Sequence, residues 1–243
     1  MALLVPGGGA DDRSMLIAED LLLLLTDDDS GKLAASTTLV DIALGGALLV
    51  ELALTERVDV AGPDERVPQG RLVVRDAGPT GDEVLDEALT RAASKEGKKP
   101  QGVVTALGKG ARGRLYERLA ASGILRAEEG RVLGLFPTHH WPTQDAGHEA
   151  AVRAALDTAL KNRAATDPRT GALIALLSAL NVVHEVVDPG AVGLSKRELN
   201  ASASRIAEGD WAASAVRSAI DSMMAAIIAA SASAVVVTGS GVS

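Results

Sequence analysis

Apolar residues recur at helical spacing in several separate segments of this chain. The clearest segment is TLVDIALGGALLVELALTERV, whose apolar face is formed by Leu39, Ile42, Ala43, Leu49 and Leu52. Gly45 and Gly46 interrupt this segment, and a glycine costs about 1 kcal/mol inside a helix unless close packing requires the missing side chain. The pattern therefore predicts a buried helix that packs tightly at its glycine pair.

Other apolar segments predict further helices before and after this one. A short apolar helix is expected within residues 15–31. The segment DPRTGALIALLSALNVVHEVVD begins with Asp167 as a cap and Pro168 at the first helical position. It is apolar on almost every side from 172 to 187, which is typical of a central, buried helix. A last helix is expected from about Trp211.

Shorter runs predict strands. RVDV and RLVVR flank the loop AGPDERVPQG and are expected to form one hairpin. A second hairpin is expected after the turn at Gly123, with its tip at Glu128, Glu129 and Gly130. The predicted fold is therefore mainly α, a single compact helical domain with a buried central helix and two small β-hairpins.

Four carboxylates, from Asp82, Glu83, Asp86 and Glu87, lie close together in the run GPTGDEVLDEALTRA. Thr80 and Glu83 have the spacing of a capping box, in which two side chains bind the free amides of the first helical turn. Acidic residues near a helix N-terminus also stabilise the helix dipole. The run therefore predicts the start of a helix rather than a metal or acid/base site.

No other motif points to catalysis. The chain has no cysteine, which excludes disulfides and thiolate chemistry. His139, His140 and His148 lie near acidic residues, but no HExxH spacing is present and no zinc site is expected. His184 is expected to be a hydrogen-bonded core histidine. The run PGGGA lacks the lysine of a phosphate-binding loop, so we predict no enzyme activity, no metal and no cofactor.

The charge of the chain is unevenly distributed. The net charge is −8, yet residues 95–118 contain seven basic residues against Glu96 and Glu117, a net of +5, so the remainder carries −13. The basic residues are Lys95, Lys98, Lys99, Lys109, Arg112, Arg114 and Arg118. A local basic patch on an acidic protein suggests a specific anionic partner rather than general affinity for nucleic acid. On charge alone, an ordinary solvated surface is the simpler explanation.

The two ends of the chain raise the question of a membrane. The N-terminus has no basic region typical of a signal peptide, so a cytoplasmic location is expected. Residues 222–243 carry no charge, but they are rich in alanine and serine and lack a basic or aromatic flank. A buried terminal helix explains them better than a membrane span. The expected organisation is a flexible N-terminus (1–13), one domain (14–238) and a flexible tail (239–243).

Several runs, in this order and spacing, resemble the Golgi phosphoprotein 3 family (GPP34-type domain). They are LLLLLTDDDSGKL, GGALLVELALTERV, DAGPTGDEVLDEAL, LYERLAASGIL and the apolar segment at 172–187. The resemblance implies a single, mostly helical domain that acts as a peripheral membrane protein and not as an enzyme. Eukaryotic members bind the headgroup of phosphatidylinositol 4-phosphate for Golgi attachment and serve as adaptors for membrane enzymes. By resemblance, we expect a peripheral, adaptor-type lipid-binding protein.

The resemblance also implies a site. The family's two basic headgroup residues fall on Lys109 and Arg112, with Arg114 close by, so an anionic phospholipid headgroup, such as a phosphoinositide, is the expected partner. The family's aromatic residue and arginine in an earlier helix match Ser36 and Gly45. Half of the headgroup contacts are therefore missing, and binding is expected to be weaker and less selective. Glycines in the basic segment predict a poor helix there, and the acidic hairpin tip predicts repulsion from an anionic bilayer.

Other interpretations stay open. Arginine outnumbers lysine 17 to 7, which suggests a GC-rich bacterial gene and hence a cell without a Golgi. The basic patch could then bind a partner protein in a scaffold without lipid affinity, and self-association is a further expectation from the family hairpin. The helix and hairpin at 114–136 also match the outline of a winged-helix nucleic-acid binder, which the acidic tip disfavours.

Overall fold

The computed structural model describes residues 15–27, 30–126, 128–132, 136–209 and 224–232. Its helices are α1 (Ile17–Leu25), α2 (Thr37–Leu54), α3 (Glu83–Ala93), α4 (Pro100–Gly108), α5 (Ala111–Ala121), α6 (Gly147–Asn162), α7 (Pro168–Ala179), α8 (Val183–Val186) and α9 (Lys196–Ala207). Its strands are β1 (Val58–Val60), β2 (Leu72–Val74), β3 (Glu128–Val132) and β4 (Phe136–His140). Residues 224–232 are also helical. The predicted mainly α fold is confirmed.

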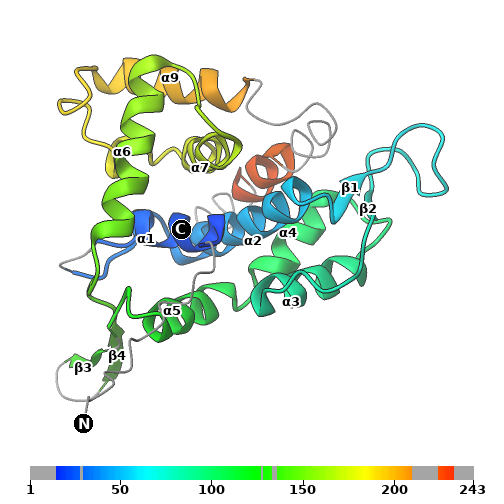
Figure 1. The fold of residues 1–243 in the computed structure, drawn as a ribbon, viewed down its shortest axis with the longest axis horizontal. Helices are drawn as coiled ribbons and strands as arrows, with labels where there is room; N and C mark the ends of the chain where they lie inside the picture. Colours follow the sequence, from blue (N-terminus) through cyan, green and yellow to red (C-terminus); the bar gives the residue numbers. More distant parts are fainter. Residues whose placement is uncertain (1–14, 28–29, 127, 133–135, 210–223, 233–243) are drawn as a thin grey trace, which may run out of the picture.

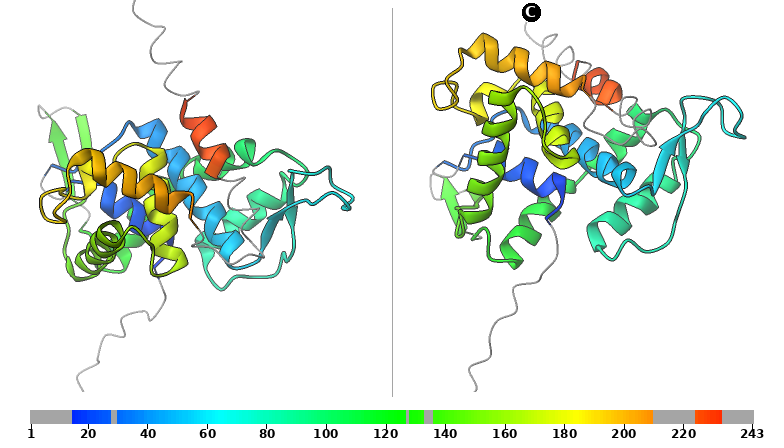
Figure 2. Two further views of the ribbon diagram at one scale, coloured as in Figure 1. Left: turned by 90° about the horizontal axis from the view of Figure 1, so that it is seen from above. Right: turned by 45° about the horizontal axis from the view of Figure 1, so that its top comes forward.

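The helices form layers around α1 and α2 (Figure 1). Helix α2 contacts α1, α3, α4, α5 and α7, so it connects the two sides of the molecule. Helices α3, α4 and α5 lie on one side of it, whereas α6, α7 and α9 lie on the other. The hairpin formed by β1 and β2 projects from the body as an arm (Figure 2). The core is therefore built on α1, α2 and α7.

Helix α7 is buried and central, as predicted, but it is shorter than predicted. Asp167 caps it, with Pro168 at its first position, as expected from the sequence. Residues 170–177 are all buried. The predicted continuous helix to 187 is wrong, because Asn181 adopts a left-handed conformation with φ of 57° after α7 has ended. Asparagine tolerates this conformation better than most residues, and the chain re-enters a short helix, α8.

The start of α3 also differs from its prediction. Asp82, not Thr80, is the N-cap, and its carboxylate accepts hydrogen bonds from the amides of Val84 and Leu85. The Thr80 hydroxyl instead donates to Asp86 at 2.7 Å. Aspartate is as good a cap as threonine or better, and it lies directly before the helix. The helix was predicted correctly, but the Thr80–Glu83 capping box was wrong.

Both hairpins form, although one of them turns at a different place from the prediction. Strands β1 and β2 pair antiparallel, with Asp59 opposite Val73. In the second hairpin, Glu128 and Glu129 pair with His140 and His139 and therefore lie within β3, not at a tip. The expectation of an acidic tip is wrong for this reason.

The glycine pair of α2 lies in tight packing, as predicted. A Cβ atom added at Gly45 would lie 2.1 Å from the carbonyl oxygen of Val104 in α4. One added at Gly46 would lie 2.3 Å from the side chain of Ile227. Within the described residues, α2 is also the one helix long and apolar enough to cross a membrane, but 67% of it is buried inside the protein, as in many core helices.

The chain ends are described only in part. Of the uncharged stretch at 222–243, residues 224–232 are helical, with Met224, Ala226, Ile227 and Ala230 buried in the core. This part agrees with the predicted buried terminal helix. The expected helix start near Trp211 and the two flexible ends, 1–13 and 239–243, lie outside the described residues. The domain boundaries stay predictions.

Candidate functional site

The basic residues of 95–118 lie in different parts of the structure. Lys99 is the N-cap of α4 and Lys109 is its C-cap, so the lysines before α4 lie one helix length from Lys109. Arg118 is not on the surface at all, since its side chain is only 10% exposed. Lys109, Arg112 and Arg114 lie along the chain at the junction of α4 and α5, where Arg112 reaches Asp41 of α2 and Arg114 reaches Glu87 of α3. The linear patch is therefore reduced to one group of three basic residues.

This group lies at the N-terminus of α5, which is a regular helix despite its glycines. Gly110 is the N-cap with φ of 74°, a conformation that favours glycine. It supplies no side-chain cap to the first amides of α5. Gly113 fits within the helix, so the prediction of a poor helix here is wrong. Uncapped amides and the helix dipole make such a terminus favourable for negative charge.

Two of the three basic residues are already paired with carboxylates. Arg112 donates from Nε to Asp41 Oδ1 of α2 at 2.9 Å. Arg114 Nε lies 3.1 Å from Glu87 Oε2 of α3. Both arginine side chains stay about one-third exposed, at 33% and 31%. Lys109 is exposed.

A fourth cation supports this arrangement from α3. Arg91 donates from Nη1 to the carbonyl oxygen of Lys109 at 2.8 Å, and from Nη2 to Glu87 at 2.7 Å. It therefore holds the turn between α4 and α5. We define the basic cluster as Arg91, Lys109, Arg112 and Arg114; with Asp41 and Glu87 it has four positive and two negative charges.

Backbone contact between α2 and α4 determines where the basic cluster lies. Gly108 ends α4 directly before Lys109, and a Cβ atom added there would lie 2.0 Å from the carbonyl oxygen of Asp41. Gly45 makes the matching contact one turn further along α2. Because backbones meet without side chains between them, Asp41 is held at a fixed place beside the Lys109 turn.

A comparison with protein families agrees with this architecture. The family model described as Golgi phosphoprotein 3 (GPP34) matches residues 17–223. The chain belongs to this family. No curated protein matches the chain. Members of the Golgi phosphoprotein 3 family are in general not enzymes. The acidic run GPTGDEVLDEAL is explained by the start of α3, without a catalytic site.

Ser36 and Gly45 are the positions matched by resemblance to the aromatic residue and the arginine of the family's headgroup site. Ser36 is the N-cap of α2, where its hydroxyl accepts from the Leu39 amide at 3.4 Å. Gly45 is buried against the backbone of α4. A side chain at position 45 would collide with the backbone of α4, so in this protein the position matched to the family's arginine serves helix packing. Only the basic cluster is left as a candidate headgroup site among the residues matched by resemblance.

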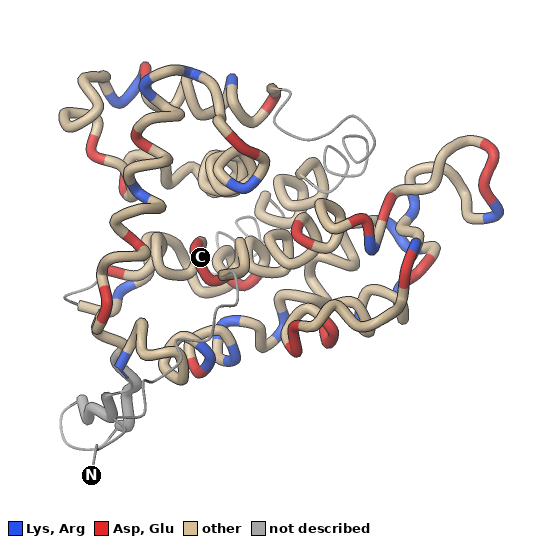
Figure 3. The backbone as a smooth tube through the Cα atoms, in the orientation of Figure 1, with Lys and Arg blue, Asp and Glu red and all other residues tan. Residues whose placement is uncertain are grey.

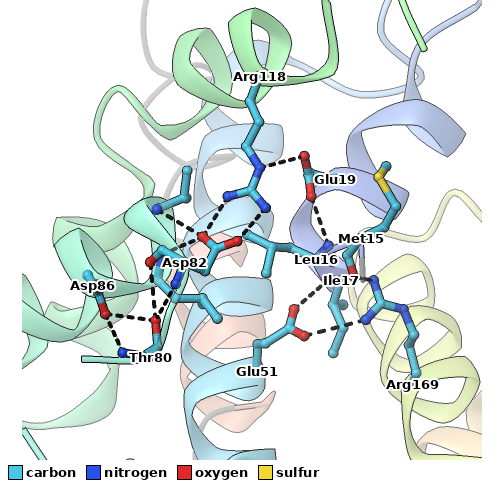
Figure 4. A network of polar contacts seen from close by, with 12 residues as sticks. Met15, Leu16, Ile17, Glu19, Glu51, Thr80, Asp82, Asp86, Arg118 and Arg169 are labelled. Atoms are coloured by element: carbon cyan, nitrogen blue, oxygen red, sulfur yellow. Dashed lines mark hydrogen bonds and ion pairs between the residues drawn. The ribbon is translucent and has the colours of Figure 1, made fainter. Parts of the chain in front are cut away.

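Arg118 belongs to a separate, buried ion network (Figure 4). Its guanidinium binds both carboxylate oxygens of Asp82, with Nη1 at 2.5 Å from Oδ1, and its Nε lies 3.0 Å from Glu19 of α1. Burial alone would raise the pKa of Asp82, but Arg118 and the amides of α3 hold it below its ordinary value. The network joins α1, α3 and α5, so its role is structural.

A second buried network joins α1 to α2, α6 and α7. Asp20, which is 1% exposed, accepts from Arg169 Nε at 2.8 Å and lies 2.6 Å from His148 Nε2. Glu51 accepts from the Ile17 amide at 2.5 Å and from Arg169 at 3.4 Å. Burial raises the pKa of Glu51. Together, the two networks place an arginine beside each buried carboxylate of α1, Arg118 beside Glu19 and Arg169 beside Asp20.

Replacing His148 by glutamine is expected to destabilise the protein in a pH-dependent way. The hydrogen bond to Asp20 raises the pKa of His148, and the negative charges of Asp20 and Glu19 act in the same direction, against smaller opposing effects of burial and of the positive charge of Arg169. A histidine whose pKa rises on folding stabilises the folded state below its unfolded pKa of about 6.5, and this contribution is lost as pH rises through the folded pKa. Urea unfolding of both proteins across this range measures the difference. A destabilisation independent of pH would contradict the charged contact.

The described residues do not support a metal site. No group of three or more His, Asp or Glu side chains is placed to hold a metal ion in the described part of the chain. His148 is engaged with Asp20, and His184 lies 3.0 Å from Glu185. A surface hollow of about 440 Å³ lies between the end of α1 and Arg153, and it does not include any member of the basic cluster.

Proposed function

We propose that this protein is a non-enzymatic, adaptor-type peripheral membrane protein that binds an anionic phospholipid headgroup through Lys109, Arg112 and Arg114. The expected location is the cytoplasm, at the cytoplasmic face of a membrane. The observation that supports it best is that these three residues flank or lie in the first turn of α5, whose N-terminus has no side-chain cap. Membership of the Golgi phosphoprotein 3 family agrees with such a role.

The chemistry of the basic cluster suits a phosphate group. Arginine offers a fork of N–H donors that can bind two phosphate oxygens, and lysine offers a compact point charge. The free amides of α5 add donors with the same preference for an anion. Because carboxylates already neutralise part of the charge, attraction by charge alone is expected to be moderate. Directional hydrogen bonds would then provide much of the affinity.

Removing the three basic side chains is expected to weaken binding to anionic vesicles about a hundredfold, at roughly 1 kcal/mol for each basic residue near the surface. The variant Lys109→Ala/Arg112→Ala/Arg114→Ala can be compared with the native protein by co-sedimentation. The vesicles would be phosphatidylcholine alone, or phosphatidylcholine with phosphatidylinositol, phosphatidylinositol 4-phosphate or phosphatidylserine. Binding at low and moderate salt separates simple charge attraction from specific contacts.

A matched control removes the same charge elsewhere. Lys196, Arg197 and Arg205 are exposed on α9, which lies at the opposite edge of the molecule from α5 in the view of Figure 3. Their triple alanine variant is expected to bind vesicles as the native protein does. Equal losses in both triple variants would show that net charge, not the basic cluster, determines binding. No binding of the native protein to any anionic vesicle would refute the proposal and favour a protein-binding scaffold.

A further inference from the structure

We infer that Asp41 is a positioning residue for the proposed headgroup site. It orients the guanidinium of Arg112 so that its two terminal nitrogens face the incoming phosphate. This inference rests on the proposed function, because it assigns a role to a residue beside the same site. Neither the sequence pattern nor the family match assigns a role to Asp41.

The geometry of the contact favours orientation over simple neutralisation. Asp41 binds Arg112 through Nε, at 2.9 Å, and not through the terminal Nη atoms. Within the described part of the chain, neither Nη atom of Arg112 has a hydrogen-bond partner. An arginine held by Nε keeps the end of its fork free for bidentate binding of an oxyanion. The side chain is 33% exposed, so an anion can reach it.

The position of Asp41 does not depend on flexible side chains. Gly108 packs directly on the carbonyl of Asp41, and Gly45 packs on the carbonyl of Val104, so α2 and α4 touch through their backbones. Lys109 follows Gly108, and Arg112 lies in the first turn of α5. The anchor and the basic residues are therefore parts of one rigid unit. A preorganised donor costs less conformational entropy on binding than a free arginine side chain.

Glu87 provides a built-in comparison, because its contact with the basic cluster is of a different kind. It lies 3.1 Å from Arg114 Nε, but that nitrogen is buried without a hydrogen bond. Its stronger contact, at 2.7 Å, is with Arg91 in the same helix. Glu87 therefore lowers the local charge without orienting Arg114 by a hydrogen bond. Asp41 and Glu87 carry equal charge, but only Asp41 makes a hydrogen bond that can orient an arginine of the basic cluster through Nε.

The test compares four proteins: the native chain, Asp41→Ala, Asp41→Asn and Glu87→Gln. Binding to phosphatidylcholine vesicles that contain phosphatidylinositol 4-phosphate is measured by co-sedimentation. Asp41→Ala is expected to bind about fivefold more weakly, as for one lost hydrogen bond, although it removes a negative charge. Asp41→Asn keeps an oxygen that can accept from Nε, so it is expected to bind at least as tightly as the native protein. Glu87→Gln is expected to bind up to about fivefold more tightly, from the removed charge alone.

A second measurement detects the hydrogen bond between Arg112 and Asp41 in the absence of lipid. The side-chain NMR signal of the Arg112 Nε–H group should be protected from exchange in the native protein and in Asp41→Asn, and lose that protection in Asp41→Ala. Loss of protection together with weaker binding supports the inference. Tighter binding of Asp41→Ala, or an Nε–H signal that does not change, overturns it while the headgroup function stands. If the native protein binds no anionic vesicle, both the function and the role of Asp41 fall.

Discussion

Replacing Arg118 by alanine is expected to lower the free energy of unfolding by about 3–5 kcal/mol, the cost of leaving buried charge uncompensated. Glu19 is fully buried and Asp82 is 16% exposed, and both lose their cationic partner in this variant. Urea unfolding followed by circular dichroism measures the change. Arg118 also holds α3, α5 and α1 together, so the loss should be cooperative across the whole domain.

Two further variants test the cause of this loss. Arg197→Ala removes an exposed arginine of α9 and is expected to change stability by less than about 0.5 kcal/mol. Adding Glu19→Gln to Arg118→Ala removes one of the buried charges and should recover part of the stability. A loss in Arg118→Ala as small as that in Arg197→Ala would show that the network does not stabilise the fold.

Replacing Gly108 by alanine is expected to cost about 3 kcal/mol, at the upper end of what overpacking of a core costs. The added Cβ atom would lie 2.0 Å from a backbone oxygen of α2, which cannot move aside as a side-chain tip can. Helices α2 and α4 would have to separate. The same unfolding experiment measures this cost.

Gly102, in the same helix, is the matched control. A Cβ atom added there meets nothing within 4 Å. Alanine favours the helix over glycine by about 1 kcal/mol, so Gly102→Ala should stabilise the protein. If both variants had the same stability, the close contact of α2 and α4 would be wrong. Gly108→Ala should also weaken headgroup binding more than Gly102→Ala, because it displaces Asp41 from the basic cluster.

Local signals allowed much of the fold to be predicted. Asp167 and Pro168 predicted the start of α7, and the structure confirms both positions. These signals involve neighbouring residues only, so they can be read from a short stretch of sequence. The first hairpin was predicted in the same way, from two short runs, RVDV and RLVVR, that flank the loop AGPDERVPQG.

The interpretation failed where distant residues decide the structure. Asp82 and Arg118 are separated by 36 positions, and nothing local shows that they pair. Arg118 was therefore grouped with the surface basic residues. The end of α7 before Asn181 was missed for a related reason, since apolar residues continue on both sides of the break.

Of the candidate site, three of the four cations were expected from the sequence, whereas Arg91 and both anions were missed. Lys109, Arg112 and Arg114 came from charge and from the family resemblance, whereas Asp41 and Glu87 were assigned no role in the site. The sequence contained one indication of a role for Asp41, because an acidic residue in a mostly apolar helix often has a partner. Its partner lies 71 positions away, so the sequence could show that a partner exists but not which residue it is.

The position of α1 has a consequence for synthesis on the ribosome. This helix is made before the other described helices, yet all nine of its residues are buried in the finished protein. The partners of Asp20 are made 128 and 149 positions later. Helices α2 and α5 can cover part of α1 sooner, but the side that packs on α6 and α7 stays uncovered until those helices are made, and exposed apolar segments are prone to aggregate or to bind chaperones. Burial of α1 can therefore be completed only after the chain has been made beyond Arg169, so the nascent protein is expected to need protection during this interval.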